Sequence, residues 1–213
     1  MIERIIFDLD NTILMHDKSQ LNDYKTVLRN AGFACEDENA LNIYQAIGKY
    51  ELRGLRYEKE ALLNFINNEL HTDYPLSLID QIIDIIGENW TGFLAPNIIP
   101  ALEYLSQKYD LYVLTNWFTK SQVMRLKGAK LDKYFKEVVG SDMCDIKPNS
   151  DSYKYFIKDT EPHKCLMIGD SPDIDLDGAI KLGMKGLLYD YKSKYKDTNY
   201  DKFTDWNQIK DIL

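Results

Sequence analysis

The sequence has few cysteines, no long apolar run and no surplus of positive charge, and each absence excludes a class of protein. Its three cysteines, Cys35, Cys144 and Cys165, lie far apart without paired metal-ligand spacing, so a reducing compartment fits best. No run approaches the roughly 18 apolar residues of a membrane span. The first twenty residues lack the basic start, apolar stretch and cleavage site of a secretory signal. We therefore expect a cytoplasmic protein without a membrane partner.

The charge balance argues against a nucleic-acid polymer as the partner. The chain carries 26 Lys and Arg against 34 Asp and Glu, a net charge of -8, whereas proteins that bind nucleic acid need a basic face. With 213 residues, of which 45% are hydrophobic and 28% are charged, the chain can form one sizeable core and a second small module.

Short apolar runs that alternate with helical patterns predict the fold class. The first run, residues 3–7, is too short for a helix and reads as a buried strand. Four later runs each follow a predicted helix: the runs are residues 111–115, 137–140, 165–169 and 185–189, and the helices lie near residues 101–108, 121–127, 152–158 and 176–182. This alternation predicts an α/β protein with a Rossmann-like parallel sheet covered on both faces.

Between the first strand and the rest, the periodicity is helical throughout. From about residue 21 to residue 90, apolar residues recur every three or four positions, as in Leu78, Ile79, Ile82 and Ile83. We therefore predict a core domain of residues 1–15 and 96–213 and an all-helical insertion of residues 16–95.

Polar side chains gather where the predicted strands end, which is where open α/β sheets bind ligands. They are Asp8 and Asp10 after the first strand, Thr115 and Asn116 after the second, Lys147 after the third, and Asp170, Asp173 and Asp175 after the fourth. Carboxylates brought together repel one another, and a bound cation relieves that repulsion. Magnesium binds carboxylate oxygens and commonly shares its remaining positions with a substrate phosphate. Taken singly, these residues are ordinary turn, capping or solvated loop residues. Their joint occurrence predicts a magnesium and phosphate site.

Four segments carry a resemblance to a known family. FDLDNT at residues 7–12, LTN at 114–116, Lys147-Pro148 and GDSPDID at 169–175 resemble the motifs of the haloacid dehalogenase-like hydrolase superfamily. The position and size of the helical insertion resemble the cap domain of its first subfamily. Most members are magnesium-dependent phosphatases, so the resemblance implies hydrolysis of a small phosphate monoester, such as a nucleoside monophosphate or a sugar phosphate.

The resemblance also assigns roles to the catalytic residues. Asp8 would attack phosphorus and form an aspartyl-phosphate, and Asp10 would act first as acid and then as base. Thr115 and the backbone amide of Asn116 would hold phosphoryl oxygens. Lys147 would neutralise charge on the nucleophile and the phosphate.

The metal site follows from the same resemblance. Asp8 and Asp170 would bind Mg²⁺ through their side chains and Asp10 through its backbone carbonyl. Asp175 would orient Lys147 or a water bound to the metal. Asp173 lies in the same loop and ranks second to Asp175.

The insertion is expected to set substrate specificity, because a cap closes over the leaving group. The helical pattern is interrupted at Gly54, which Arg53 and Arg56 flank, and Trp117 directly follows Asn116. Arg53, Arg56 and Trp117 are therefore candidate contacts for the leaving group. Each has an alternative explanation without a substrate: the arginines would lie at a solvated corner between two helices, and Trp117 would serve structural packing.

Other reactions use a similar constellation. A phosphomutase would keep the same residues but would need a cap that excludes water and holds a second phosphate. A receiver-like signalling domain also gathers aspartates, Thr and Lys around magnesium, but it resembles the reverse chain order and has no place for the helical insertion. A catalytically idle binding protein on the same fold is a further alternative. The sequence predicts no oligomeric state.

Overall fold

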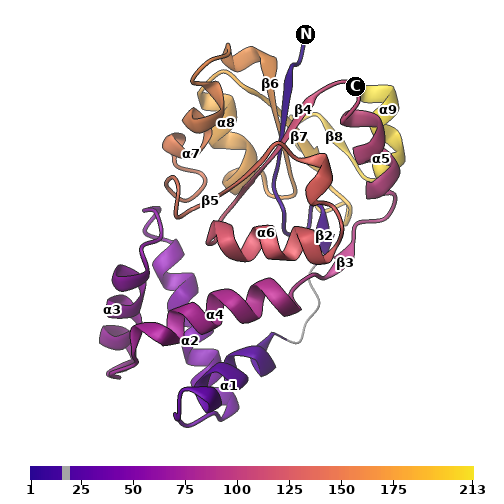
Figure 1. Cartoon of the computed structure of the whole chain (residues 1–213). Helices are drawn as coiled ribbons and strands as arrows, with labels where there is room; N and C mark the ends of the chain where they lie inside the picture. Colours follow the sequence, from indigo (N-terminus) through magenta and orange to yellow (C-terminus); the bar gives the residue numbers. More distant parts are fainter. Residues whose placement is uncertain (16–19) are drawn as a thin grey trace.

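The short apolar runs form the strands of one parallel sheet (Figure 1). The computed structural model describes residues 1–15 and 20–213, and in this part of the chain the sheet has six strands in the order β5-β4-β1-β6-β7-β8. In sheet order their bounds are Glu137–Gly140, Asp110–Thr115, Arg4–Phe7, Cys165–Gly169, Lys185–Tyr189 and Lys202–Phe203. Every neighbouring pair is parallel. The predicted fold class is confirmed.

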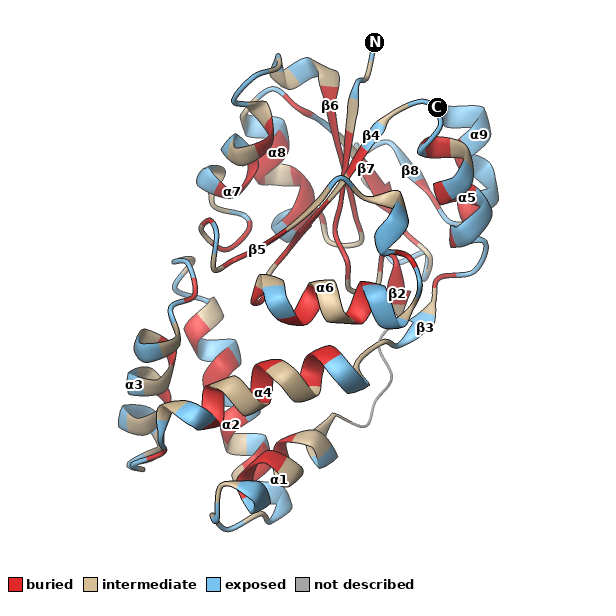
Figure 2. Cartoon of the chain, viewed as in Figure 1, coloured by how far each residue is buried: buried red, intermediate tan, exposed pale blue. Residues whose placement is uncertain are grey.

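Two helical layers cover the sheet because successive strand residues point to opposite faces. Ile5 and Phe7 belong to one buried cluster, whereas Ile6 between them belongs to another. The first cluster includes side chains of α5 (Ile98–Leu105), α6 (Thr119–Gly128) and α9 (Ile209–Ile212). The second includes side chains of α7 (Ser150–Lys154) and α8 (Asp177–Lys181). The strands between the layers are mostly buried (Figure 2).

Several predicted helices have shifted bounds. The helix expected near residues 101–108 starts at Ile98, because Pro100 is tolerated within a first turn. The helix expected near residues 152–158 starts at Ser150, because the Asn149 side chain caps its start by accepting a hydrogen bond from the Asp151 amide. It continues as a 3₁₀ turn, Tyr155–Ile157. The helix expected at 176–182 is preceded by a π-helical turn, Pro172–Leu176.

The segment between β1 and β4 holds four amphipathic helices, which we call the helical module. They are α1 (Leu21–Asn30), α2 (Asp37–Glu51), α3 (Lys59–Leu70) and α4 (Leu76–Asn89). Their apolar faces form a buried cluster of their own, which Trp117, Phe118 and Ile146 from outside the module join. A short antiparallel pair, β2 (Leu14–Met15) with β3 (Phe93–Leu94), brings the two ends of this segment together. The predicted boundary between residues 15 and 16 adjoins residues outside the description.

The helical module contacts the sheet layers most closely where α4 meets α6 (Figure 1). A Cβ atom on Gly87 of α4 would lie 2.9 Å from the Met124 sulfur of α6, so a larger residue would push the helices apart. Within the described part of the chain, no helix has both the length and the apolar character needed to cross a membrane.

Candidate functional site

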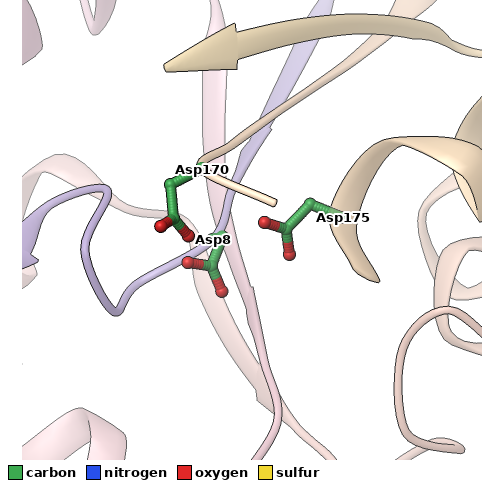
Figure 3. Close-up of side chains that lie close together, drawn as sticks. All are labelled: Asp8, Asp170 and Asp175. Carbon is green, nitrogen blue, oxygen red and sulfur yellow. The ribbon is translucent and has the colours of Figure 1, made fainter. Parts of the chain in front are cut away.

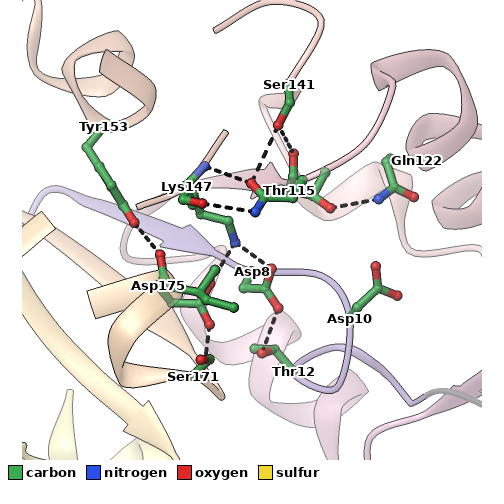
Figure 4. A network of polar contacts seen from close by, with 12 residues as sticks. Asp8, Asp10, Thr12, Thr115, Gln122, Ser141, Lys147, Tyr153, Ser171 and Asp175 are labelled. Carbon is green, nitrogen blue, oxygen red and sulfur yellow. Dashed lines mark hydrogen bonds and ion pairs between the residues drawn. The ribbon is translucent and has the colours of Figure 1, made fainter. Parts of the chain in front are cut away.

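Lys147 holds two carboxylates at the carboxyl edge of the sheet (Figure 4). Its Nζ atom donates to Asp8 Oδ1 at 2.6 Å and to Asp175 Oδ1 at 2.7 Å. The Lys147 side chain is only 1% exposed. Burial by itself lowers the pKa of Lys147, but the charges of Asp175 and Asp8 outweigh burial and raise it above its usual value. The ammonium therefore stays charged between its two partners.

Asp8 sits directly after β1 and is almost completely buried. Its second carboxylate oxygen accepts a hydrogen bond from Thr12 Oγ1 at 3.1 Å. Burial raises the pKa of Asp8 well above its usual value. The carboxylates of Asp175 and Asp10 also raise this pKa, whereas the charge of Lys147 lowers it. One lysine thus does not balance the negative charge around Asp8.

Three carboxylates converge at this point (Figure 3). One oxygen each from Asp8, Asp170 and Asp175 lies within 4.8 Å of the others. Burial, and next the charge of Asp175, raises the pKa of Asp170 to about 6. Oxygen donors under mutual repulsion fit a hard divalent cation such as Mg²⁺, which would supply the missing positive charge. Both Asp175 oxygens accept hydrogen bonds, from Lys147 and from the Ser171 amide at 3.0 Å, and both Asp8 oxygens accept as well, from Lys147 and Thr12.

The π-helical turn after β6 gives Asp173 and Asp175 different environments. Asp175 is 2% exposed and turns toward Lys147, whereas Asp173 is exposed. Gly169 makes room for this arrangement, because a Cβ atom there would lie 2.3 Å from Asp175 Oδ2. The structure therefore brings Asp175, and not Asp173, to the site.

Thr115 and Asn116 end β4 beside the same cluster and are fixed by neighbours. Thr115 Oγ1 accepts a hydrogen bond from Gln122 Nε2 at 2.7 Å. The Asn116 side chain donates to the Lys147 carbonyl at 3.2 Å and accepts from the Lys147 amide at 2.9 Å. Asn116 thus positions the backbone of the lysine that holds Asp8.

Asp10 lies at the other side of the site and is paired with a buried arginine. Both terminal nitrogens of Arg125 donate to the Asp10 carboxylate, one of them at 3.0 Å. Arg125 Nε donates to the carbonyl of Trp90, directly after α4, at 2.7 Å. The same guanidinium donates to Gln122 Oε1 at 2.8 Å, so Gln122 connects Asp10 with Thr115.

These residues open into a pocket of about 540 Å³ between the sheet edge and the helical module. The module contributes Tyr24, Tyr44, Ile47, Glu51 and Ile86 to its lining. Trp117 also lines it, and its ring packs edge-on against Tyr57 at a centroid distance of 5.1 Å. Trp117 thus both lines the pocket and packs against Tyr57, and its contact with a leaving group stays a prediction.

Arg53 and Arg56 are not among the lining residues that the structure describes. The Arg53 guanidinium lies over the Tyr50 ring, 4.9 Å from its centroid. Arg56 donates to the Asp142 carbonyl at 2.7 Å and so connects the module with the loop after β5. The structure thus does not bring these two arginines together with the aspartates.

Sequence reasoning did not single out Thr12, Gln122, Arg125 or Glu51 as site residues. Thr12 stands inside the first motif, so its position was a usable signal. Gln122 and Arg125 are three residues apart on α6, a spacing typical of one helix face. Their partners lie far away in the sequence, and only the fold identifies them.

The sequence model of the haloacid dehalogenase-like hydrolases matches residues 2–183, and the chain belongs to this family. It is therefore an enzyme of the hydrolase class, in agreement with the resemblance of its four motifs. Those motifs contain Asp8, Asp10, Thr12, Thr115, Asn116, Lys147, Asp170 and Asp175, whereas Gln122 and Arg125 lie outside them on α6.

Two similar proteins are named as a phosphatase and a nucleotidase. The chain is 28% identical over 207 residues to the ribulose-1,5-bisphosphate 5-phosphatase of Halopiger xanaduensis, covering 89% of this chain and 85% of the relative. It is 27% identical over 203 residues to a pyrimidine 5'-nucleotidase of Streptococcus pneumoniae, covering 87% and 82%. These similarities agree with the predicted class, a phosphoric monoester hydrolase.

Solved structures share the fold. The HAD-hydrolase YfnB of Bacillus subtilis, bound to magnesium, superposes with a TM-score of 0.73 at 17% identity, over 100% of this chain and 98% of that one.

Proposed function

We propose that this protein is a magnesium-dependent phosphatase that hydrolyses small phosphate monoesters through an aspartyl-phosphate on Asp8. One observation carries the proposal: Asp8 is held by buried Lys147 within a cluster of carboxylates that has room for a cation. Phosphoryl transfer depends on positioning and on charge stabilisation over the phosphoryl oxygens. The named relatives support phosphate esters as substrates.

In the first half-reaction, an Asp8 carboxylate oxygen attacks phosphorus and the bond from phosphorus to the leaving oxygen breaks. Lys147 keeps the nucleophile in place and offsets negative charge on the transferring group. The Thr115 hydroxyl and the Asn116 backbone amide would donate to phosphoryl oxygens. Asp10, in its protonated form, gives its proton to the leaving oxygen.

In the second half-reaction, water displaces Asp8 from phosphorus. Asp10, now ionised, takes a proton from the water as its oxygen attacks, and the bond from phosphorus to Asp8 breaks. Inorganic phosphate leaves and both carboxylates return to their starting state. A single residue thus acts as acid and then as base, which requires Asp10 to be placed well relative to both leaving group and water.

Mg²⁺ would be held by Asp8 and Asp170, with the Asp10 carbonyl and Asp175 as further candidates. When bound, it supplies positive charge that shields the nucleophile and the phosphate from each other. YfnB, which shares the fold, is a magnesium-bound protein, and this supports the assignment.

We further propose that the helical module is a cap that covers the phosphate site during reaction. Its pocket-lining residues face Asp8 and Lys147 across the pocket. We also propose a cytoplasmic location, since Cys35, Cys144 and Cys165 are all free thiols.

Release of p-nitrophenol from p-nitrophenyl phosphate, with and without Mg²⁺, tests the proposal. Wild-type protein should turn over only with Mg²⁺. Asp8→Asn should lose at least about a thousandfold in kcat. Because the pKa of Asp8 is raised in the fold, the neutral isostere should fold and melt normally. Asp142→Asn, in the loop after β5 and outside the pocket, is the matched control and should stay active.

Substantial activity in Asp8→Asn would overturn the covalent mechanism. Assay of inorganic phosphate separates the alternatives: a phosphomutase would move the phosphoryl group between positions without releasing it. A binding protein would bind Mg²⁺ and phosphate esters without turning over any ester of a broad panel.

A further inference from the structure

Glu51 is a carboxylate that the phosphatase mechanism does not use, although it faces the phosphate site. It is the last residue of α2 and lines the same pocket as Asp8, Asp10 and Lys147. It therefore shares with Lys147 and Asp10 the pocket into which a leaving group would extend.

Glu51 belongs to a stripe on one face of α2. Tyr44, Ile47 and Glu51 are spaced by three and four residues, the spacing that aligns side chains along a helix. All three line the pocket. Tyr44 is 47% exposed, so part of its ring surface is free to contact a bound molecule. The stripe thus runs from an acidic group to an aromatic one.

The pocket contains no spare positive charge among the described residues. Its described lining carries five carboxylates, Asp8, Asp10, Glu51, Asp170 and Asp175, and two cations, Lys147 and Arg125. Lys147 is engaged by Asp8 and Asp175, and Arg125 is engaged by Asp10. A divalent cation at the aspartate cluster would act on the transferring phosphate and not on a distant second anion.

We propose that Glu51 is a specificity-determining residue that accepts hydrogen bonds from hydroxyl or N–H groups of the leaving group and excludes leaving groups with a second anionic group. The inference rests on the proposed phosphatase function. The favoured substrates are therefore phosphate monoesters of uncharged alcohols that carry hydrogen-bond donors. A second phosphate or carboxylate would meet a carboxylate without a compensating cation among the described lining residues.

Burial affects how Glu51 should be tested. Burial raises the pKa of Glu51 to about 7. The charge of Asp10 also raises this pKa, and the charge of Lys147 lowers it. Measurements at pH 8 therefore keep the carboxylate ionised in most molecules.

Glycerol 3-phosphate and 3-phosphoglycerate form a matched pair of probes, because the terminal hydroxymethyl group of the first is a carboxylate in the second. Each can be measured as a competitor of p-nitrophenyl phosphate, whether or not it is hydrolysed itself. At pH 8 with Mg²⁺, wild-type protein should bind glycerol 3-phosphate at least about tenfold more tightly, a difference of roughly 1.4 kcal/mol.

Glu51→Gln keeps the shape and removes the charge, and it should reduce this preference by about tenfold, mainly through tighter binding of 3-phosphoglycerate. Glu51→Lys should reverse the preference. The kcat for p-nitrophenyl phosphate should change far less than the inhibition constants. Glu38→Gln, at an exposed position near the start of the same helix, removes the same charge away from the pocket and should leave the preference unchanged.

Equal binding of the two probes by the wild type, or an unchanged preference in both Glu51 variants, would overturn this inference while p-nitrophenyl phosphate turnover persists. Loss of that turnover in the wild type would instead contradict the proposed function. Calorimetry would then measure the dissociation constants of glycerol 3-phosphate and 3-phosphoglycerate, and glycerol 3-phosphate should again bind more tightly.

Discussion

The Asp10 carboxylate lies against the guanidinium of Arg125, and each of its oxygens accepts a hydrogen bond from a different terminal nitrogen. The Arg125 side chain is 3% exposed, and its Nε also donates to the Trp90 carbonyl at the end of the helical module. Two planar groups joined in this way have a fixed relative orientation. The proposed acid and base is thus oriented by a residue that also contacts the module.

Replacement of Arg125 should affect substrates according to their need for a proton. The ratio kcat/KM reports the steps through transfer to Asp8, in which Asp10 acts as acid. In Arg125→Gln, kcat/KM for glycerol 3-phosphate should fall about 10- to 100-fold, because an alkoxide leaves poorly without a proton. For p-nitrophenyl phosphate it should fall less than about threefold, since the phenolate needs little protonation.

Lys127→Gln is the matched control, because Lys127 is an exposed cation on the same helix. Arg125→Gln should also lower the free energy of unfolding by about 1–3 kcal/mol, since buried hydrogen bonds are lost. Equal loss of kcat/KM for both esters would mean that Arg125 acts only by supporting the fold.

Asp175 and Asp173 provide a direct comparison within one turn. Asp175→Asn weakens the partner that holds Lys147 opposite Asp8, so kcat should fall about 100-fold or more through misplacement of the lysine. Asp173→Asn, at an exposed position two residues away, should retain kcat within about twofold. Steady-state kinetics on p-nitrophenyl phosphate measure both variants. A larger loss in Asp173→Asn would contradict the placement of Asp175.

The strands and the polar residues at their ends were predictable from sequence. Residues 137–140, 165–169 and 185–189 form strands at the predicted bounds, because each is a short, mostly apolar run that follows a helix. The strand β8, Lys202–Phe203, carries no such run and was not predicted. The pair β2 and β3 was also missed, since each strand has two residues and its partner lies across the whole module.

The candidate site was predictable only where its chemistry is local. Asp8 and Asp10 stand side by side in a motif, whereas Arg125 lies 115 residues from Asp10 and reads as an ordinary polar helix residue. Glu51 likewise looks like one acidic residue among many until the fold places it in the lining of the pocket that Lys147 also lines. Arg53 and Arg56 show the opposite case, because their charge was visible in the sequence while their contacts with Tyr50 and Asp142 were not.

Asp170 should make the stability of the metal-free protein depend on pH. Its folded-state pKa is raised to about 6, above the usual value of about 3.9, so between these values the folded state binds more protons than the unfolded one. The contribution of Asp170 to stability therefore falls as pH rises from about 4 to about 6, and the full penalty applies above that range. Without metal, Asp170→Asn should raise the melting temperature at pH 7.5 and change it less at pH 5.

Magnesium should remove this penalty in the wild type. At a concentration 100 times its dissociation constant, a ligand bound only by the folded state adds about 2.7 kcal/mol to the free energy of unfolding. Thermal unfolding at pH 7.5 with EDTA or with Mg²⁺ measures the effect, with exposed Asp173→Asn as the control that should shift like the wild type. Asp170→Asn should show little or no shift with Mg²⁺. An equal shift in Asp170→Asn would mean that the cation binds elsewhere, because the three converging carboxylates would then be reduced to two without consequence.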